Sequence, residues 1–222
     1  MDRQVGQYNL HPKCAVMAAG NLSTDKAIVN RISTAMQSRL IHFEIEVDVK
    51  GWIRWADTHD IDHRIKSFIN FKPEALHKFD PNHNESTFPT PRTWDFMSRL
   101  IHRYDKLDSK KIPLLSGCVG EGMAREFFSY CQIYGDLPTI QAIIKDPQNV
   151  KFGNEPSIHF ALTGLVSHHF KKENADKLMT FLNRLSLDFQ VIALRSILAK
   201  HSEYKDNEAI RGWIIKNSKE LI

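Results

Sequence analysis

Residues 90–104 read TPRTWDFMSRLIHRY, and this stretch carries the pattern that dominates the chain. Trp94, Met97, Ile101 and Tyr104 recur at three- and four-residue steps. That spacing places all four side chains on one face of a helix, because an α-helix turns once every 3.6 residues. The stretch therefore predicts a helix that packs one apolar face against a core.

Arg92 falls in the first turn of this predicted helix, after Thr90 as N-cap and Pro91 as the first helical residue. A helix start has unpaired N–H groups and a positive dipole end, so a cation there is unfavourable unless an anion joins it. Backbone amides and the Arg92 guanidinium could together bind a phosphate. The alternative is a salt bridge to a nearby acid, Asp80, Glu85 or Asp95. The stretch alone leaves both open.

The sequence after Asp48 shows the same helical periodicity. Further helices are predicted at 52–60, 61–71, 119–135, 157–169, 174–185, 187–200 and 206–217. Two irregular connections interrupt them, KFDPNHNESTFPTP (78–91) and DPQNVKFGNEP (146–156). We therefore predict a helical domain over residues 50–145 and a helical extension over 146–222.

The first 49 residues have a different pattern. KCAVMAAGN (13–21) is a continuous apolar run, which is typical of a strand buried on both faces of a parallel sheet. LIHFEIEV (40–47) alternates apolar and polar residues, as a half-buried strand does. A helix with its N-cap among residues 23–25 is predicted between them. The predicted fold is therefore α/β but mainly α, with a partial α/β core at 1–49.

Composition favours a folded protein without a membrane span. The chain has 222 residues, of which 42% are hydrophobic, and this is enough for a sizeable core. Its 30 Lys and Arg against 26 Asp and Glu give a net charge of +4. The basic residues are scattered, which argues only weakly for nucleic acid. No apolar run reaches membrane-spanning length, and MDRQVGQYN has no signal-peptide core, so a cytoplasmic location is expected.

Metal ligands and catalytic triads are not evident in the sequence. Cys14, Cys118 and Cys131 show no metal-ligand spacing and are expected to be reduced thiols. The histidines at 159, 168 and 169 lack the acidic and cysteine partners of a metal site. GCVGEGMA (117–124) has no Lys-Ser/Thr, so it is not a phosphate-binding P-loop and indicates close helix packing. No metal is therefore predicted.

Asn21 and Arg39 are two further candidates for contact with a ligand. Asn21 ends the predicted buried strand, and ligands of α/β folds bind beyond the carboxyl ends of strands. The alternative is that Gly20-Asn21 only makes a turn. Arg39 ends the predicted helix, where a cation offsets the helix dipole. It could instead reach a neighbouring subunit and stabilise phosphate charge, as an arginine finger does.

Four stretches, taken in order, resemble the second half of an AAA+ ATPase module, and most closely a MoxR-like ATPase of bacteria or phages. They are QVGQYNLHPKCAVMAAGN, STDKAIVNRISTAMQSRLIHFEIEVD, GWIRWA and FPTPRTWDFMSRLI. The resemblance runs from about residue 4 to 145 and implies ATP-driven remodelling of protein or nucleoprotein complexes. It implies that Asn21 is the sensor 1 residue, Arg39 the arginine finger and Arg92 the sensor 2 arginine.

The chain departs from such a module in lacking its nucleotide-binding motifs. It contains neither the Walker A motif GxxxxGK[ST] nor a Walker B strand ending in Asp-Glu, and FEIEVD follows the sensor 1 strand instead of preceding it. The resemblance implies ATP and Mg²⁺ as cofactors only together with the missing N-terminal half. We therefore predict that this chain alone neither binds ATP tightly nor hydrolyses it.

Three explanations of the missing half stay open: a truncated or split reading frame, a deliberately expressed fragment, or a degenerate subunit that lends Arg39 to a partner. The partners implied are neighbouring AAA+ subunits or a separate P-loop-bearing half, and an adaptor of the von Willebrand A type. The alternative function is a non-enzymatic helical interaction module that binds a protein or nucleic acid. Salt dependence would distinguish the nucleic acid case.

Overall fold

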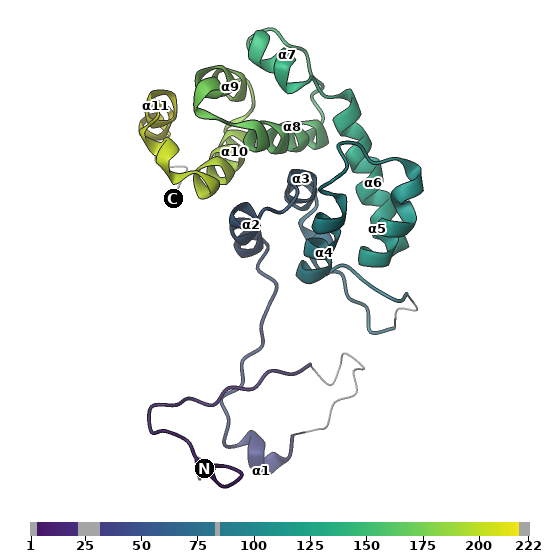
Figure 1. The fold of residues 1–222 in the computed structure, drawn as a ribbon, viewed down its shortest axis with the longest axis vertical. Helices are drawn as coiled ribbons and strands as arrows, with labels where there is room; N and C mark the ends of the chain where they lie inside the picture. Colours follow the sequence, from purple (N-terminus) through teal and green to yellow (C-terminus); the bar gives the residue numbers. More distant parts are fainter. Residues whose placement is uncertain (1–3, 22–31, 83–84, 218–222) are drawn as a thin grey trace. The chain divides into compact units, whose positions relative to one another are not determined.

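The computed structural model describes residues 4–21, 32–82 and 85–217, and this part of the chain is mainly helical (Figure 1). It divides into two units, Met1–Ile45 and Glu46–Ile222. The expectation of a mainly helical protein is confirmed. The unit Glu46–Ile222 contains no strand among its described residues.

Ten helices make up the described part of the unit Glu46–Ile222. They are α2 (Val49–Thr58), α3 (His63–Phe71), α4 (Pro91–Ile101), α5 (Ile112–Val119), α6 (Glu121–Asp136), α7 (Ile140–Lys145), α8 (Pro156–His169), α9 (Ala175–Leu182), α10 (Leu187–Lys200) and α11 (Glu208–Lys216). Short 3-10 turns lie between some of them, namely η2 (Pro73–Leu76), η3 (Ser109–Lys111), η4 (Lys172–Asn174) and η5 (Ser202–Asp206).

Every helix predicted after residue 50 is present, whereas α5 and α7 were not predicted. The sequence of α5, IPLLSGCV, is apolar nearly all round, so it shows no helical period. The six residues of α7 are too few to display one. Their local signals are a proline in the first turn of α5 and the N-cap Thr139 before α7, whose hydroxyl accepts from Ala142 N.

Aromatic rings from three helices form the centre of the first core cluster, which lies among α2 to α6. Phe68 of α3, Trp94 of α4 and Phe127 of α6 pack against one another with ring centroids 5.4–5.7 Å apart. The indole N–H of Trp94 donates to the Ala75 carbonyl at 2.8 Å, so this fully buried ring keeps its hydrogen bond. The apolar face predicted for residues 90–104 is therefore confirmed as a core face.

The second core cluster lies among α7 to α11, and α8 connects it to the first. The α8 helix packs closely against both α3 and α10 (Figure 1). Ser67 of α3 hydrogen-bonds to Tyr130 Oη of α6 and donates to the Phe160 carbonyl of α8, each at 2.6 Å. The α3 and α8 backbones approach closely at Gly164, where a Cβ would lie only 3.0 Å from Ser67 Cβ. Both clusters thus belong to one packed unit.

The unit Met1–Ile45 has little regular structure among its described residues. The strands β1 (Gln4–Val5) and β2 (Tyr8–Asn9) form a short antiparallel hairpin with Gly6 at φ +60° in its turn, and α1 (Thr34–Gln37) is a single turn capped by Ser33. The N-cap predicted at residues 23–25 lies outside the described residues. Of the helix predicted between the two strands, the described part thus contains only α1.

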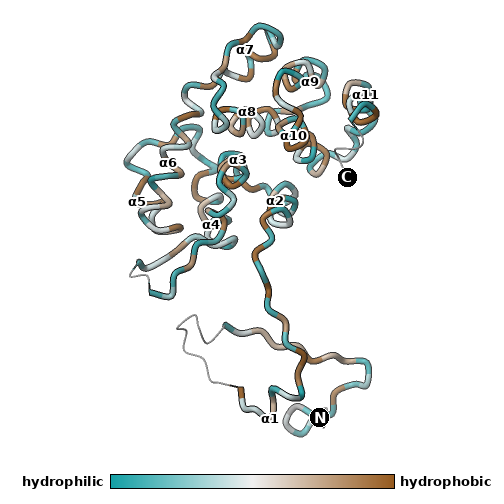
Figure 2. The backbone as a smooth tube through the Cα atoms, turned by 180° about the vertical axis from the view of Figure 1, so that it is seen from behind, coloured by the Kyte–Doolittle hydropathy of each residue, from teal (hydrophilic) through white to brown (hydrophobic). Residues whose placement is uncertain are grey.

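The strands predicted at 13–21 and 40–47 are not confirmed, since neither segment forms a strand. Their apolar side chains face solvent: Met17 is 91% exposed, Phe43 85% and Ile45 93%. Figure 2 shows the alternating hydropathy of the tube that leads into α2. A strand needs a partner for its backbone N–H and C=O groups and a layer that covers its apolar face. The described part of this chain offers neither to these segments.

Two expectations from composition can be compared with the structure. Cys14 is exposed and Cys118 and Cys131 are buried, and all three are reduced cysteines, as expected. Among the described residues, no helix has both the length and the apolar character needed to cross a membrane.

Candidate functional site

Arg92 occupies the second position of α4, as the sequence predicts. Thr90 is the N-cap, and its hydroxyl accepts from Thr93 N at 3.1 Å. The Thr93 hydroxyl in turn accepts from Thr90 N at 2.8 Å, which completes a capping box. Pro91 is the first helical residue and has no N–H. The start of α4 is therefore a fixed structure that holds Arg92 in the first turn.

This capping box limits what the helix start can offer to an anion. Thr90 and Thr93 use each other's backbone N–H, and Pro91 has none, so Arg92 N is the remaining first-turn amide without a partner among the described residues. The expectation that several backbone amides of the first turn would bind a phosphate is therefore not met. Any anion at this place would be bound by the Arg92 guanidinium with one amide beside it.

The salt bridges considered for Arg92 do not form among the described residues. Asp95 pairs instead with Arg99, one turn further along α4, at 2.5 Å. Arg92 is exposed and makes no hydrogen bond or ion pair with another described residue. Its first turn also contains no acidic side chain. A cation thus stands at the positive end of α4 without compensation, which favours the anion interpretation over the salt bridge.

Asn21 and Arg39 belong to the unit Met1–Ile45, whereas Arg92 belongs to the other unit. Asn21 is exposed and lies in no strand, so its predicted place at the end of a buried strand is not confirmed. Arg39 is exposed just after α1, and its guanidinium donates to the Ala35 carbonyl. This contact is the helix-end role that was one of the two alternatives for Arg39.

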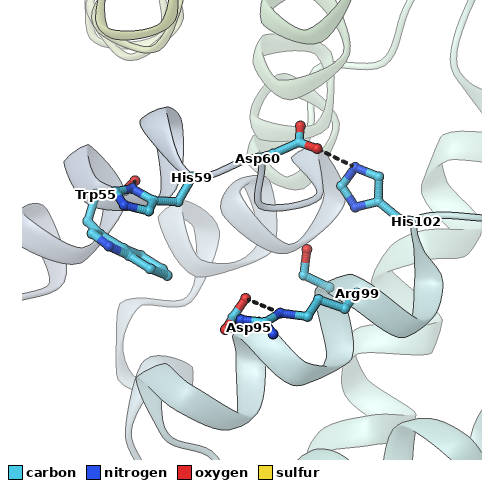
Figure 3. Close-up of a pocket in the computed structure, with 7 residues that line it drawn as sticks. Trp55, His59, Asp60, Asp95, Arg99 and His102 are labelled. Atoms are coloured by element: carbon cyan, nitrogen blue, oxygen red, sulfur yellow. Dashed lines mark hydrogen bonds and ion pairs between the residues drawn. The ribbon is translucent and has the colours of Figure 1, made fainter.

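A small pocket, which the sequence did not indicate, lies between the end of α2 and α4 (Figure 3). The Trp55 and His59 rings stack with centroids 4.5 Å apart on one side. Two ion pairs line the rest, the Asp95–Arg99 pair of α4 and the pair that joins Asp60 to His102 at 3.4 Å. The pocket measures about 270 Å³, slightly below the roughly 300–1,000 Å³ typical of small-molecule sites.

A much larger cavity of about 1590 Å³, here called the helical cleft, also lies in the unit Glu46–Ile222. Residues of α2, α3, α6, α7, α8 and α10 line it, together with Lys205 of η5 and residues of the segment 102–107 after α4. No sequence pattern points to this cleft, because its walls come from segments more than 100 residues apart. It exists only through the packing of α8 and α10 on the earlier helices.

Two buried ion pairs lie at the wall of the helical cleft. Arg64 binds Asp62 with two hydrogen bonds of 2.7 and 2.9 Å and donates to the carbonyl oxygens of Ile101 and Tyr104. Burial alone would raise the pKa of Asp62, but the hydrogen bonds and charge of Arg64 lower it below its ordinary value. Asp57 accepts from Lys66 at 2.8 Å and from the Ser196 hydroxyl of α10 at 2.5 Å. These pairs connect distant helices.

Two histidines stack at the contact of α3 with α8. The rings of His63 and His168 lie parallel, with centroids 4.5 Å apart. Burial lowers the pKa of His63 to about 3, although Asp62 opposes this, and burial also lowers the pKa of His168 to about 4. Both rings are therefore neutral near pH 7. Among the described residues, no group of three or more His, Cys, Asp or Glu side chains is arranged to bind a metal.

No protein-family model, no curated protein and no solved structure matches this chain. The resemblance to AAA+ ATPases therefore rests on the quoted stretches alone. Arg92 fits one contact to a nucleotide phosphate, but the sequence contains no Walker A motif to hold the triphosphate. The residues of this chain thus fit a contact to a nucleotide but not its binding site.

Proposed function

We propose that this chain is the part of a MoxR-like AAA+ ATPase that responds to nucleotide held by residues outside this sequence. In that role Asn21 is sensor 1, Arg39 the arginine finger and Arg92 the sensor 2 arginine. The observation that carries the proposal is Arg92 itself, an exposed arginine without an ion-pair partner among the described residues, in a helix start with no acidic side chain. Such a position is favourable only when an anion joins it.

A second observation supports the proposal. The segments at 13–21 and 40–47 expose large apolar side chains, among them Met17, Phe43 and Ile45. Large apolar side chains that are exposed in two segments of one unit favour an interface that a partner covers. Strands supplied by a P-loop-bearing polypeptide would give these segments both hydrogen-bonding partners and cover. The function proposed for this chain is then that of the family, the ATP-driven remodelling of protein or nucleoprotein complexes. Its proposed partners are neighbouring AAA+ subunits or an adaptor of the von Willebrand A type.

The proposal is tested by supplying the missing motifs. The Walker A and Walker B half of a MoxR-like ATPase, ending before its sensor 1 strand, is fused to residue 4 of this chain. The fusion should hydrolyse ATP, whereas the chain alone should not. Removing an arginine finger costs about 10³ to 10⁵ in rate in related phosphoryl transfer reactions, so Arg39→Ala should reduce the turnover of the fusion severely.

Arg99→Ala is the matched control for Arg92→Ala, because both arginines are exposed on α4 but Arg99 pairs with Asp95. ATP hydrolysis should be lost with Arg92→Ala and kept with Arg99→Ala. Equal turnover of the two variants, with unchanged helical content by circular dichroism, would contradict the sensor 2 role. Tight ATP binding by the unfused chain would contradict the proposal that the nucleotide is held by residues outside this sequence.

The second candidate is a non-enzymatic helical interaction module. It is favoured by the core of the unit Glu46–Ile222, because two clusters of buried side chains among α2 to α11 support this unit, whose described residues form no sheet. If the partner is nucleic acid, binding must weaken steeply between about 50 and 200 mM salt, since phosphate contacts release counterions. Affinity for single-stranded DNA that does not change over this range would exclude the nucleic acid form of this candidate.

A further inference from the structure

The helical cleft is too large for an ordinary small-molecule site. Its volume of about 1590 Å³ exceeds the roughly 300–1,000 Å³ of pockets that enclose drug-sized ligands. Six helices, from α2 to α10, contribute to its lining, so the cleft is formed by the packing of the helices and not by a single loop. A cavity of this size and position can accommodate a segment of another polypeptide.

The charges on the lining of the helical cleft leave an excess of cations. Four aspartates line it, Asp57, Asp60, Asp62 and Asp105. Asp57 pairs with the cation Lys66 and Asp62 with the cation Arg64, and Asp60 contacts the His102 imidazole at 3.4 Å. Four lysines on the lining are exposed and make no ion pair with another described residue, Lys50, Lys106, Lys200 and Lys205. A ligand with carboxylates would therefore find cations that are not engaged elsewhere.

The same lining also presents half-buried apolar side chains. They are Ile53 of α2, Ile140 of α7, Leu165 of α8, and Ile192 and Leu198 of α10. Ile192 belongs to neither core cluster, so its apolar surface is available to a ligand. Apolar surface bordered by unengaged lysines is complementary to a segment that has one apolar face and one acidic face.

We propose that the helical cleft binds an acidic amphipathic helix of a partner protein. The apolar face of that helix lies against side chains such as Ile192, and its carboxylates reach lysines such as Lys106 and Lys200. A helix is the fitting form, because the described part of the unit Glu46–Ile222 has no strand edge with which an extended peptide could pair. A helix satisfies its own backbone groups. The inference goes beyond nucleotide response and does not depend on it.

Nucleic acid fits the helical cleft less well than an acidic helix. A single strand carries a phosphate at each nucleotide, and its backbone would meet Asp60 and Asp105 as well as the lysines. It would also leave the apolar side chains of α10 without a matching surface. Binding of single-stranded DNA is therefore kept as an outcome of the test and not as part of the proposal.

The probe is a displayed library of helix-forming peptides of about 16 residues, four to five turns, selected on the full chain. Selected peptides should be enriched in Asp and Glu on one face and in apolar residues on the other. The tightest peptide is then synthesised with a fluorescent label, together with a twin in which Lys replaces every Asp and Glu. The acidic peptide should bind at least about tenfold more tightly than its basic twin.

Three variants locate the peptide in the helical cleft. Lys106→Glu with Lys200→Glu should weaken binding by about tenfold or more, because two attractive contacts become repulsive. Ala199 is exposed on the lining, so Ala199→Trp should fill the cleft and weaken binding without disturbing the core. Ile192→Ser should weaken binding through the apolar face. Circular dichroism and the Tm establish that each variant is folded.

Lys145→Glu with Lys177→Glu is the matched control, since both lysines are exposed and lie outside the cleft lining while the net charge changes equally. This control should bind the peptide as the parent chain does. A selection without acidic enrichment, or equal losses in the control and in Lys106→Glu with Lys200→Glu, would overturn the proposal. So would displacement of the peptide by a 20-nucleotide single strand at equal concentration in about 150 mM salt.

Discussion

The two units of this protein differ in whether their large apolar side chains are buried. In Met1–Ile45, Phe43 is 85% exposed, whereas in Glu46–Ile222 Phe68 and Phe127 are buried. A helix forms its backbone hydrogen bonds within itself, so an amphipathic helix needs only apolar neighbours. A strand needs a partner strand before it can form at all. Apolar composition thus produces a core only where the segment can satisfy its own backbone.

Trp94→Ala should have the largest effect, because it removes a fully buried ring from the centre of the first core cluster. The change also leaves the Ala75 carbonyl without its indole donor. We expect a loss of about 3–5 kcal/mol in the free energy of unfolding, measured by urea titration with circular dichroism. A loss below about 1 kcal/mol would mean that this core does not support the helical unit as described.

Arg64→Leu should be nearly as damaging, because it leaves Asp62 buried without its cation. Removing one partner of a buried pair typically costs about 3–5 kcal/mol. The double variant Asp62→Asn, Arg64→Leu is the control, since it removes the uncompensated charge as well. It should recover part of the lost stability. If both variants lose the same amount, the packing of Arg64 matters more than its charge.

Gly164→Ala tests the close approach of α3 and α8. A Cβ at this position would lie 3.0 Å from Ser67 Cβ and Tyr134 Oη and 3.2 Å from the His63 carbonyl oxygen. We expect a loss of about 1–3 kcal/mol from overpacking, despite the better helix propensity of alanine. Gly212→Ala is the matched control in α11, because a Cβ there meets nothing within 4 Å. It should stabilise by up to about 1 kcal/mol.

Acidification should destabilise the helical unit between about pH 6.5 and 4. His63 and His168 have folded-state pKa values of about 3 and about 4, below the ordinary value of 6.5. In that window the unfolded chain binds protons that the folded chain does not, so the free energy of unfolding falls as the pH falls. The Tm measured across this range should decrease, and the decrease should be smaller for His168→Asn. A flat profile for the parent chain would contradict the neutral stacked pair.

Phe43→Ser should have the smallest effect of the five changes. The side chain is exposed and is a member of neither core cluster, so the stability of the unit Glu46–Ile222 should change by less than about 0.5 kcal/mol. The substitution is instead expected to improve solubility, because it removes exposed apolar surface. A clear loss in the Tm of the helical unit would show that the segment at 40–47 packs on it.

Eight of the ten helices of the unit Glu46–Ile222 could be predicted because each carries a local signal, whereas α5 and α7 were not predicted. The steps between Trp94, Met97 and Ile101 define a core face, and Thr90 with Pro91 marks the start of α4. The position of Arg92 followed from the same residues. The sequence did not predict that Arg92 lacks a salt bridge, since the spacing of Asp95 allows a pair with either Arg92 or Arg99. The structure pairs Asp95 with Arg99.

The strands at 13–21 and 40–47 could not be judged from sequence, because their pattern describes what a sheet would bury and not whether a sheet is there. The helical cleft also could not be predicted from the sequence. Its lining combines residues of α2 and α3 with residues of α8 and α10, and the Asp57–Ser196 hydrogen bond joins positions 139 apart in the sequence. No period or motif encodes such a separation.

Except for α5 and α7, the sequence by itself determined where the helices after residue 50 lie, because period and capping are local properties of the chain. Only the tertiary structure decided that the capping box of α4 engages the N–H groups of Thr90 and Thr93 and that Arg92 stays unpaired among the described residues. It also decided that six helices line a cleft whose exposed lysines have no ion-pair partner among the described residues. Hydrogen bonds and burial depend on which distant groups meet, and that is settled by packing.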